Sequence, residues 1–345
     1  MNALLLSAPS CLEFTSWPDP EPAVDEVVVR IRACGICGSD LHGWDGSSGR
    51  RRPPLIMGHE ASGEIHRIGA AVDPSWRPGD RVTFDSTLFC GKCPSCERGE
   101  VNLCENRRVV GVAPPEYRQH GAFAEFVSVP ARTLYRLPSG LAYADAAMVE
   151  PVAIALHAVG RVHLAPGFTA VVVGSGMIGL LVIQALRVAG AGRIIAVDLD
   201  DTRLALAREL GATETVRSDG DSTLERLRTI VGGRGADVAF EVVGLTPTVD
   251  LAVQSVRPGG SVVLVGNVRP RVDFSLQAVV TREISVYGSC SSAGEYPAAL
   301  DLIASGRIQV RPLISATVPL SDGAAWFARL TSLEGRGLLK VILEP

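Results

Sequence analysis

Several features that would place a protein in a simple class are scarce or absent here. The 345-residue chain has a net charge of −4, so it lacks the basic surplus typical of nucleic-acid-binding proteins. Its opening residues, MNALLLSAPSC, contain no basic segment, and their apolar run is too short for a secretory signal peptide. Internal repeats, coiled-coil heptads and low-complexity tracts are also absent. We therefore expect a cytoplasmic globular protein that binds neither nucleic acid nor a membrane.

Charged residues are also missing from residues 164–183, a run long enough to span a membrane as a helix. The run is interrupted by residues that disfavour a continuous helix: Pro166, Gly167, Gly174, Gly176 and Gly179. It therefore predicts a buried strand, a tight turn and a buried helix. The chain is 47% hydrophobic, which leaves apolar material for two cores, and its length suggests two domains at ~100–200 residues each.

The two parts of the chain have different sequence patterns. The first 150 residues are rich in Gly, Pro and short β-like runs, which predicts a compact, irregular β domain. From about Pro151, buried strands alternate with helices, which predicts a doubly wound parallel sheet and an α/β fold class. The expected strands are 169–174, 193–198, 236–244 and 260–266, and the expected helices are 177–190 and 201–211. The tail from about Ser289 contains a predicted helix at 296–304 and a final strand at 337–344.

A glycine-rich turn follows the first of these strands. Gly174, Gly176 and Gly179 form the pattern G-x-G-x-x-G, with Met177 and Ile178 between the last two glycines. The pattern is weak by itself, but here it follows a strand, opens a helix and precedes an acidic residue, Asp198, at the end of the next strand. This context predicts a dinucleotide-binding site.

Each residue of this turn has a physical role in such a site. The first glycine permits the tight turn, the second lets the backbone approach a pyrophosphate, and the third lets the helix pack against the strand. Asp198 can accept hydrogen bonds from ribose hydroxyls and would repel a 2′-phosphate, so we predict NAD as the cofactor. A glycine-rich packing turn without a ligand is the less favoured alternative. Arg203 either covers the adenine or is an ordinary surface arginine.

Four cysteines lie within one short stretch, with the spacing C-x2-C-x2-C-x7-C: Cys90, Cys93, Cys96 and Cys104. In a reducing compartment, clustered cysteines favour a metal site over disulfides. Four thiolates suit tetrahedral zinc, whereas the bacterial iron–sulfur run has a shorter last spacing and a following proline. Since four sulfur ligands leave no position for a substrate, we predict a structural zinc and expect the reaction elsewhere.

A second group of residues has the chemistry of an open zinc site. Such a site needs about three protein ligands and an exchangeable position. Cys37, His59 and Glu60 can supply the ligands, and Glu150 lies close by or takes the fourth position. Cys34 is the chief alternative ligand, because spacing alone leaves a Cys34–Cys37 pair open.

Three more residues surround these predicted ligands in sequence. Ser39 can hydrogen-bond a zinc-bound hydroxyl, and His42 can pass the proton outward. Asp40 can orient His59 from behind, as ligating histidines usually require. Each residue alone has an ordinary structural explanation, such as a buried thiol, a structural histidine or a helix cap. Their combination with a dinucleotide fold favours the functional interpretation.

The order of these motifs resembles that of the zinc-containing medium-chain dehydrogenases/reductases. The motifs are GICGSDLH, GHE, the four cysteines, GAFAEFV, MVEP and VVVGSGMIG. The glutamates in GHE and MVEP resemble the polyol branch, which includes sorbitol, galactitol-phosphate and threonine dehydrogenases. The resemblance implies the metal and relay roles given above, two zinc ions per chain, and a GroES-like catalytic domain beside a Rossmann domain. It also implies domains at 1–151 and 152–288, a C-terminal segment, 289–345, that returns to the catalytic domain, and a homodimer or homotetramer.

The chain departs from sorbitol dehydrogenases at two places. They have a pocket tyrosine where this chain has Gly43, and an arginine and an aromatic residue where 288–297 has small residues. The basic stretch 49–54, GRRRPP, either attracts an anionic substrate or forms a solvated loop, and we favour the loop. We expect zinc- and NAD-dependent oxidation of a secondary alcohol, such as a polyol, sugar alcohol, sugar phosphate or cyclitol. A ketone reductase and a noncatalytic family member are the alternatives.

Overall fold

The computed structural model describes residues 1–220 and 222–345, and the chain divides into two compact units. The β-rich unit comprises Met1–Glu150, Tyr296–Gly306 and Val310–Pro345. The parallel-sheet unit comprises Pro151–Glu295 and Arg307–Gln309. The chain thus leaves the β-rich unit and returns to it, and residues 289–295 lie in the parallel-sheet unit. The domain boundaries expected from the sequence, at 151/152 and 288/289, stay predictions.

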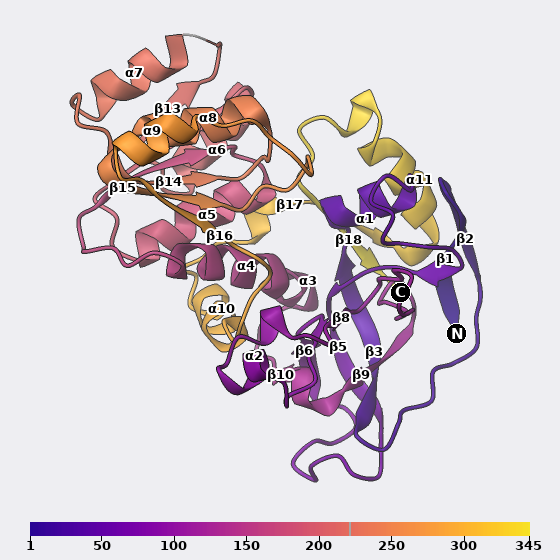
Figure 1. The fold of residues 1–345 in the computed structure, drawn as a ribbon. Coiled ribbons are helices and arrows are strands. Elements are labelled where there is room, and N and C mark those ends of the chain that lie inside the picture. The colour runs from indigo at the N-terminus through magenta and orange to yellow at the C-terminus, as the bar shows by residue number, and fades with distance from the viewer. Residues whose placement is uncertain (221) are drawn as a thin grey trace. The chain divides into compact units, whose positions relative to one another are not determined.

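The β-rich unit is built mainly of short strands with a few short helices (Figure 1). Its strands are β1 (Asn2–Ala8), β2 (Cys11–Ser16), β3 (Glu26–Gly35), β4 (Leu55–Ile56), β5 (Glu60–Ile68), β6 (Arg81–Phe84), β7 (Thr87–Leu88), β8 (Arg108–Val109), β9 (Phe126–Pro130), β10 (Leu134–Arg136), β17 (Ile314–Pro319) and β18 (Lys340–Glu344). Its helices are α1 (Gly38–Trp44), α2 (Pro94–Glu97), α3 (Tyr143–Ala147), α10 (Tyr296–Ala304) and α11 (Gly323–Leu330). Helix α4 (Val149–Gly160) begins in this unit and continues into the other.

Strand β3 is the centre of the main sheet of this unit. Within the described residues the strand order is β10-β6-β5-β3-β18-β17, and β9 also pairs with β3. The C-terminal strand β18 pairs antiparallel with β3, with Ile342 opposite Gly35. Valines and isoleucines of β3 are buried, and together with Leu4, Phe123 and Phe327 they belong to the apolar core of the unit. Side chains from both ends of the sequence, such as Leu4 and Leu343, therefore pack in one core.

The parallel-sheet unit alternates strands and helices (Figure 1). Its strands are β11 (Thr169–Val173), β12 (Arg193–Asp198), β13 (Glu214–Arg217), β14 (Ala236–Glu241), β15 (Val256–Leu264) and β16 (Ser285–Gly288). Its other helices are α5 (Met177–Val188), α6 (Asp201–Glu209), α7 (Ser222–Ile230), α8 (Thr246–Ser255) and α9 (Leu276–Thr281). The strand order β13-β12-β11-β14-β15-β16 is parallel throughout the described part of the chain, as predicted from the alternation.

The helices of this unit form two groups around the sheet. Helices α5 and α6 contact each other and β11–β13, whereas α8 contacts α7, α9 and strands on both sides of β14. The strand order reverses direction between β11 and β14, where α5 begins. In open parallel sheets, ligands bind at the carboxyl ends of the strands beside such a reversal. The predicted glycine-rich turn lies at this place.

The charge-free run 164–183 contains strand β11 and the first half of helix α5, as its glycines and proline predicted. Both elements are nearly completely buried, which explains the lack of charged side chains. Among the described residues, the helices are all too short or too polar to cross a membrane.

Candidate active site

Three of the predicted zinc ligands meet at one end of the central β3–β5 pair. Cys37 precedes helix α1, His59 precedes strand β5, and Glu60 is the first residue of β5. One ligand atom from each of the three lies within 4.8 Å of the others, and His59 and Glu60 are buried. A thiolate, an imidazole and a carboxylate are all ligands of zinc, and three of them match an open site.

Two glycines bring these side chains together. Gly58 has φ +92°, a conformation that favours glycine, and it turns the chain just before His59. Gly35 lies opposite Glu60 in the β3–β5 register, and a Cβ atom at Gly35 would fall 2.3 Å from Glu60 Oε2. A side chain at Gly35 would therefore push the Glu60 carboxylate away from the other two ligands.

Asp40 lies behind His59, as predicted for a residue that orients a ligand. Its Oδ1 atom is 3.4 Å from His59 Nδ1, and its Oδ2 atom accepts a hydrogen bond of 3.1 Å from the backbone N–H of Cys37. Burial opposes ionisation of Asp40, but His59, Arg51 and the Cys37 N–H lower its pKa to about 2. Burial would lower the pKa of His59, yet the Asp40 carboxylate raises it well above its usual range. This arrangement leaves Nε2 of His59 as the nitrogen for a metal.

The Glu60 carboxylate also contacts a buried lysine, Lys340. The Nζ atom of Lys340 donates hydrogen bonds to Glu60 Oε2 and to the backbone oxygen of Ile36, and both ionic side chains are almost fully buried. Burial would lower the pKa of Lys340, but Glu60 and Cys37 raise it. The lysine therefore balances the charge of Glu60.

Glu150 lies near this group without joining the three-residue cluster. It is buried in the first turn of α4, and burial together with Glu60 raises its pKa to about 8. A carboxyl that is neutral at pH 7 in the metal-free protein needs no partner charge there. Its role as an exchangeable ligand stays a prediction.

The two predicted relay residues lie on helix α1 and differ in exposure. Ser39 is half-buried, whereas the His42 side chain is exposed, and their relay roles stay predictions. The Oγ atom of Ser39 accepts a hydrogen bond of 3.0 Å from Arg51 Nη2.

The interpretation of 49–54 as a solvated loop is wrong for Arg51. Its side chain is 6% exposed, and its Nη2 atom is 3.2 Å from Asp40 Oδ1. Arg50 and Arg52 are exposed, as expected. A buried carboxylate attracts the middle arginine out of solvent, which a run of three arginines gives no reason to expect.

Cys34, the alternative ligand, is fully buried in β3 and lies outside the three-residue cluster. Burial and the neighbouring Asp40 and Glu60 carboxylates raise its pKa well above its usual range. A neutral thiol inside the core behaves as a small apolar side chain.

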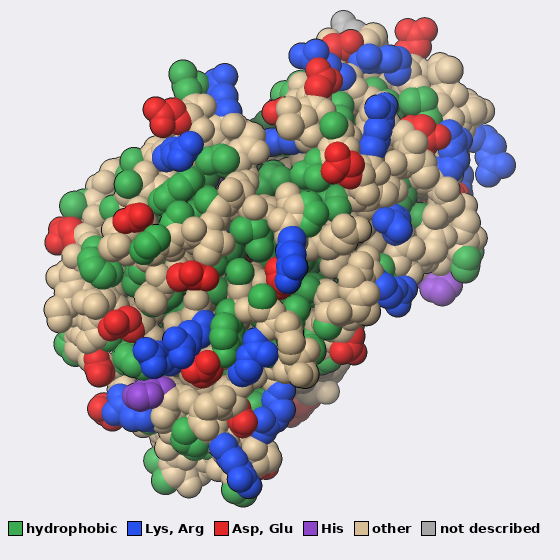
Figure 2. Space-filling model, turned by 180° about the vertical axis from the view of Figure 1, so that it is seen from behind, with side chains coloured by type: hydrophobic (Ala, Val, Ile, Leu, Met, Phe, Trp, Pro, Cys, Tyr) green, Lys and Arg blue, Asp and Glu red, His purple; other side chains and the backbone are tan. Residues whose placement is uncertain are grey.

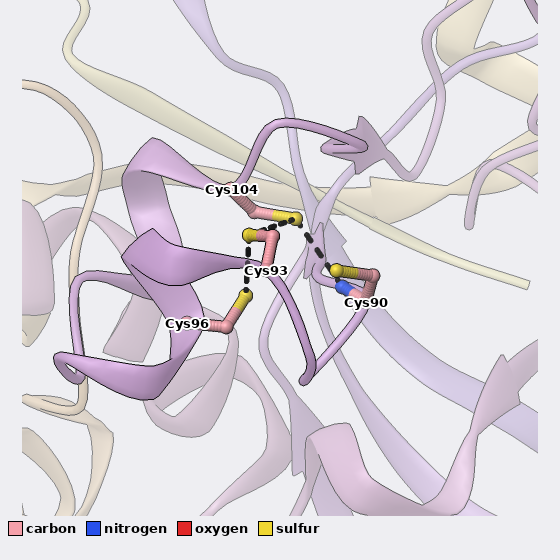
Figure 3. A group of neighbouring side chains, drawn as sticks. All are labelled: Cys90, Cys93, Cys96 and Cys104. Atoms are coloured by element: carbon pink, nitrogen blue, oxygen red, sulfur yellow. Dashed lines mark hydrogen bonds between the residues drawn. The ribbon is translucent and has the colours of Figure 1, made fainter.

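The four clustered cysteines converge on one point between α2, the turn at 101–103 and β8 (Figure 3). The Cys93 sulfur is 3.5 Å from that of Cys96 and 3.9 Å from that of Cys104. A tetrahedral zinc with Zn–S bonds of ~2.3 Å separates its sulfurs by ~3.8 Å. All four thiols are free of disulfides, and backbone N–H groups of Cys90 and Asn106 donate to Cys104 Sγ. The geometry fits a closed four-sulfur site.

The glycine-rich turn is tight at two of its glycines and open at the third. Gly174 has φ +100°, and a Cβ atom at Gly179 would fall 1.9 Å from the backbone oxygen of Gly174. At Gly176, by contrast, a Cβ atom would point into open space, where a pyrophosphate could approach the backbone. Met177 and Ile178 are the first residues of α5 and are half-buried.

The predicted ribose-binding residue ends strand β12 beside this turn. Asp198 Oδ2 accepts a hydrogen bond of 2.7 Å from the Ser175 N–H, and Oδ1 accepts one of 3.0 Å from the Asp200 N–H. A carboxylate has about four acceptor positions, so capacity remains for ribose hydroxyls. Arg203 is half-buried on α6, and its Nε atom is buried without a partner among the described residues.

Comparisons with known proteins agree with this geometry. Two family models match: the alcohol dehydrogenase GroES-like domain over residues 23–139, and the zinc-binding dehydrogenase domain over residues 178–305. Sorbitol dehydrogenase of Bacillus subtilis (strain 168) is 32% identical, and the match covers 100% of this chain and 97% of that protein. The chain belongs to the zinc-containing medium-chain dehydrogenase/reductase family. Its relatives place it in the polyol branch, with a Rossmann-like domain and a GroES-like domain, and it is an enzyme.

Other proteins described as dehydrogenases or reductases match over nearly their whole length. A probable D-xylulose reductase A of Emericella nidulans is 35% identical, with 97% of this chain and 94% of that protein covered. Galactitol-1-phosphate dehydrogenase from Escherichia coli has a TM-score of 0.91 at 28% identity, with both chains covered completely. A putative zinc-binding dehydrogenase from Sinorhizobium meliloti 1021 bound to NADP has a TM-score of 0.90 at 33% identity, covering 100% and 99%. A protein described as a short chain alcohol dehydrogenase from Escherichia coli CFT073, complexed with NADH, has a TM-score of 0.91 at 29% identity, covering 100% and 99%.

Sequence reasoning missed two residues of this dehydrogenase site, Lys340 and Arg51. A signal existed for the first: Lys340 stands inside the apolar run GLLKVILE, and a charged residue in a buried strand implies a buried partner. For Arg51 no local signal distinguishes it from its two arginine neighbours, because its burial depends on residues of helix α1.

Proposed function

We propose that this chain is a zinc- and NAD-dependent dehydrogenase that oxidises a secondary alcohol to a ketone. The observation that carries the proposal is the convergence of Cys37, His59 and Glu60 within 4.8 Å, with the Ser39 hydroxyl on the adjoining helix. Relatives described as sorbitol dehydrogenase, D-xylulose reductase and galactitol-1-phosphate dehydrogenase support a polyol, sugar alcohol, sugar phosphate or cyclitol as the substrate class. Reduction of the corresponding ketone is the same reaction reversed.

The bound groups would supply the chemistry that the side chains lack. A zinc ion held by Cys37, His59 and Glu60 would lower the pKa of a coordinated hydroxyl, and NAD would accept the hydride. The chain's residues move the proton: Ser39 takes it from the alcohol, and exposed His42 passes it to solvent. Asp40 holds His59 in the orientation and tautomer that ligation needs.

NAD is the cofactor that the site favours over NADP. The Asp198 carboxylate is fixed by two backbone N–H groups at the end of β12, where the adenosine ribose lies in a dinucleotide fold. A 2′-phosphate would meet this like charge. One relative binds NADP and another NADH, so the family by itself does not decide the cofactor.

We also propose two zinc ions per chain, one at each cluster. The sulfur separations at Cys90, Cys93, Cys96 and Cys104 support a structural zinc, and the mixed donor set at Cys37 supports a catalytic one. We also propose a reducing compartment such as the cytosol, where clustered thiolates stay available to a metal.

A homodimer or homotetramer is the assembly we propose, formed through the parallel-sheet unit. Strand β16 pairs with β15 on one side and has no second partner strand among the described residues. Large apolar side chains are exposed on β16 (Val286) and in the sequence that precedes it (Val268, Phe274, Leu276 and Val280). An unpaired apolar edge favours pairing with another strand. Light scattering of the wild type and of Val286→Lys tests this, since a monomeric wild type would contradict it.

A small-molecule substrate is the partner we propose, with neither nucleic acid nor membrane bound. On the face drawn in Figure 2, basic and acidic side chains are interspersed among hydrophobic ones and are not gathered by sign. The net charge of −4 also accords with this proposal.

The deciding experiment is turnover of an alcohol panel by zinc-loaded protein. Sorbitol, xylitol, galactitol 1-phosphate, 2,3-butanediol and myo-inositol are each incubated with NAD or NADP, and NADH or NADPH formation is followed by fluorescence. We expect one substrate class to react with NAD, and Cys37→Ser to abolish the reaction while the protein stays folded. Turnover by Cys37→Ser at the wild-type rate would contradict the assignment of the site.

A further inference from the structure

Arg51 is a buried charged residue beside the relay serine, and the proposed mechanism gives it no role. Its Nη2 atom donates to Ser39 Oγ at 3.0 Å and to Asp40 Oδ1 at 3.2 Å. The backbone beside it is fixed on both sides, because the Ala113 N–H donates to the Arg50 oxygen and the Arg52 N–H donates to the Ala113 oxygen. A fixed backbone and two hydrogen-bonded acceptors hold the guanidinium in one place.

Gly43 provides the space for this side chain. A Cβ atom at Gly43 would fall 1.8 Å from Arg51 Cδ and 2.9 Å from Arg51 Nε. Gly43 lies inside helix α1 and has no left-handed φ, so its backbone does not require glycine. The missing side chain at Gly43 therefore leaves room for Arg51 to reach Ser39.

The contact with Ser39 limits what the hydroxyl group can do. A serine hydroxyl donates one hydrogen bond and accepts two. Because a guanidinium only donates, Arg51 occupies one of the two acceptor positions of Ser39 Oγ. The other position is left for the proton of a substrate alcohol, and the serine's own proton must point away from Arg51.

The charges around Arg51 argue against its being a simple anchor for an anionic substrate. Asp40, at 3.2 Å, is ionised and compensates the positive charge. The Nδ1 atom of His59 lies 3.4 Å from the same Oδ1 atom of Asp40. A buried ion pair is also weak evidence for a contribution to stability, because desolvation offsets the attraction. The hydrogen bond to Ser39 is thus the contact of Arg51 that neither charge balance nor stability explains.

We propose that Arg51 is a positioning residue for the proton relay, admitted to the site by Gly43, and this rests on the proposed function. Arg51 holds Ser39 so that its free lone pair meets the substrate hydroxyl. As the substrate O–H bond breaks, that proton bonds to Ser39 Oγ, and the original Ser39 proton leaves toward His42. No charge or proton stays on Arg51.

The test compares Arg51→Met, Arg51→Lys, Gly43→Ala and Ser39→Ala with the control Arg52→Met, whose arginine is adjacent and exposed. Zinc-loaded proteins are assayed with xylitol as the probe alcohol and NAD, and zinc content is measured for each. Gly43→Ala keeps the arginine but displaces it, and alanine favours a helix, so this variant separates position from folding. The double variant Ser39→Ala/Arg51→Met shows whether Arg51 acts through Ser39.

We expect Arg51→Met and Gly43→Ala to lower kcat by ~10–100-fold, with KM and zinc content nearly unchanged. This loss should not exceed that of Ser39→Ala, because groups that transfer protons themselves contribute ~10²–10⁴-fold. Arg51→Lys should recover part of the loss, because an ammonium can still donate to Ser39. In the Ser39→Ala background, Arg51→Met should cause no further loss. Fully additive losses, a loss of zinc, or an effect on KM alone would each overturn the proposal, the last indicating a substrate-binding arginine.

A second readout does not depend on turnover. In protein labelled with ¹⁵N-arginine, Arg51 should give a slowly exchanging guanidinium signal, assigned by its absence in Arg51→Lys. The signal should be shifted in Ser39→Ala, lost in Gly43→Ala and unchanged in Arg52→Met. A signal insensitive to Ser39→Ala would contradict the contact. If the wild type oxidises no alcohol in the panel, the proposed function fails, and this measurement still decides whether Arg51 is held by Ser39.

Discussion

Replacing Lys340 with methionine removes one partner of a buried ion pair and tests how Glu60 is stabilised. Lys340 and Glu60 have side-chain exposures of 3% and 2%, so solvent cannot compensate the charge that remains. Breaking such a pair from one side costs ~3–5 kcal/mol. For a protein unit of 150–250 residues, ~2–4 °C of melting temperature corresponds to 1 kcal/mol. We therefore expect Lys340→Met to melt ~6–20 °C below the wild type when the Cys37 site contains no metal.

Zinc at the Cys37 site changes this expectation, because ligation then compensates the charge of Glu60. The difference in melting temperature between Lys340→Met and the wild type should shrink when zinc is added. The double variant Lys340→Met/Glu60→Gln removes both charges and should recover most of the loss in the metal-free protein, since a neutral buried pair is often as stable as an ionic one.

The assay is differential scanning calorimetry of the three proteins, with metal analysis of each sample. The first series is dialysed against a chelator that leaves one zinc per chain, and the second is saturated with zinc. If Lys340→Met with an empty Cys37 site melted within 2 °C of the wild type, the reasoning would be refuted. A double variant no more stable than Lys340→Met would refute it too.

Two further predictions concern the cofactor and Glu150. Asp198→Ala should narrow a large wild-type preference for NAD over NADP in kcat/KM, and a wild-type preference for NADP would contradict the cofactor proposal. Burial raises the pKa of Glu150 to about 8 in the folded protein, whereas an unfolded glutamate has a pKa of ~4.3. The stability that the neutral carboxyl contributes is therefore complete below pH ~4.3 and is lost as the pH rises to about 8. In chelator-treated protein, Glu150→Gln should therefore gain stability relative to the wild type between pH 5 and pH 8 in urea unfolding, and a constant difference would exclude a raised pKa.

The parallel-sheet unit was predictable because its signals are local. The expected strand 193–198 has the bounds observed for β12, since an apolar run between turn residues defines it. Strand β15 begins at Val256, earlier than the expected residue 260. Pro258 and two glycines indicate a turn, but the register shift between β14 and β15 accommodates them in the strand.

Contacts distant in sequence set the limit of prediction in the candidate site. Lys340 reaches Glu60 only because β18 returns to pair with β3, which no local pattern encodes. The burial of Arg51 depends on the space at Gly43, which a single glycine in a predicted helix does not indicate. Metal ligands were easier to predict, because their residue types and short spacings are restricted by coordination chemistry.

The two cysteine groups differ in chemistry, and three serine variants should separate them. Cys93 belongs to four converging sulfurs, and a hydroxyl is a poor replacement for a thiolate there, so Cys93→Ser should lose one of two zinc ions and with it folding or assembly. Any folded fraction should keep its activity per remaining zinc at the Cys37 site. Cys37→Ser should melt near the wild-type temperature and bind NAD, but it should turn over little. Cys34→Ser should retain both ions, because Cys34 is a buried thiol outside both clusters. If Cys93→Ser instead kept its fold and both ions while losing only turnover, the four-cysteine cluster would be the reactive site and the assignment would be inverted.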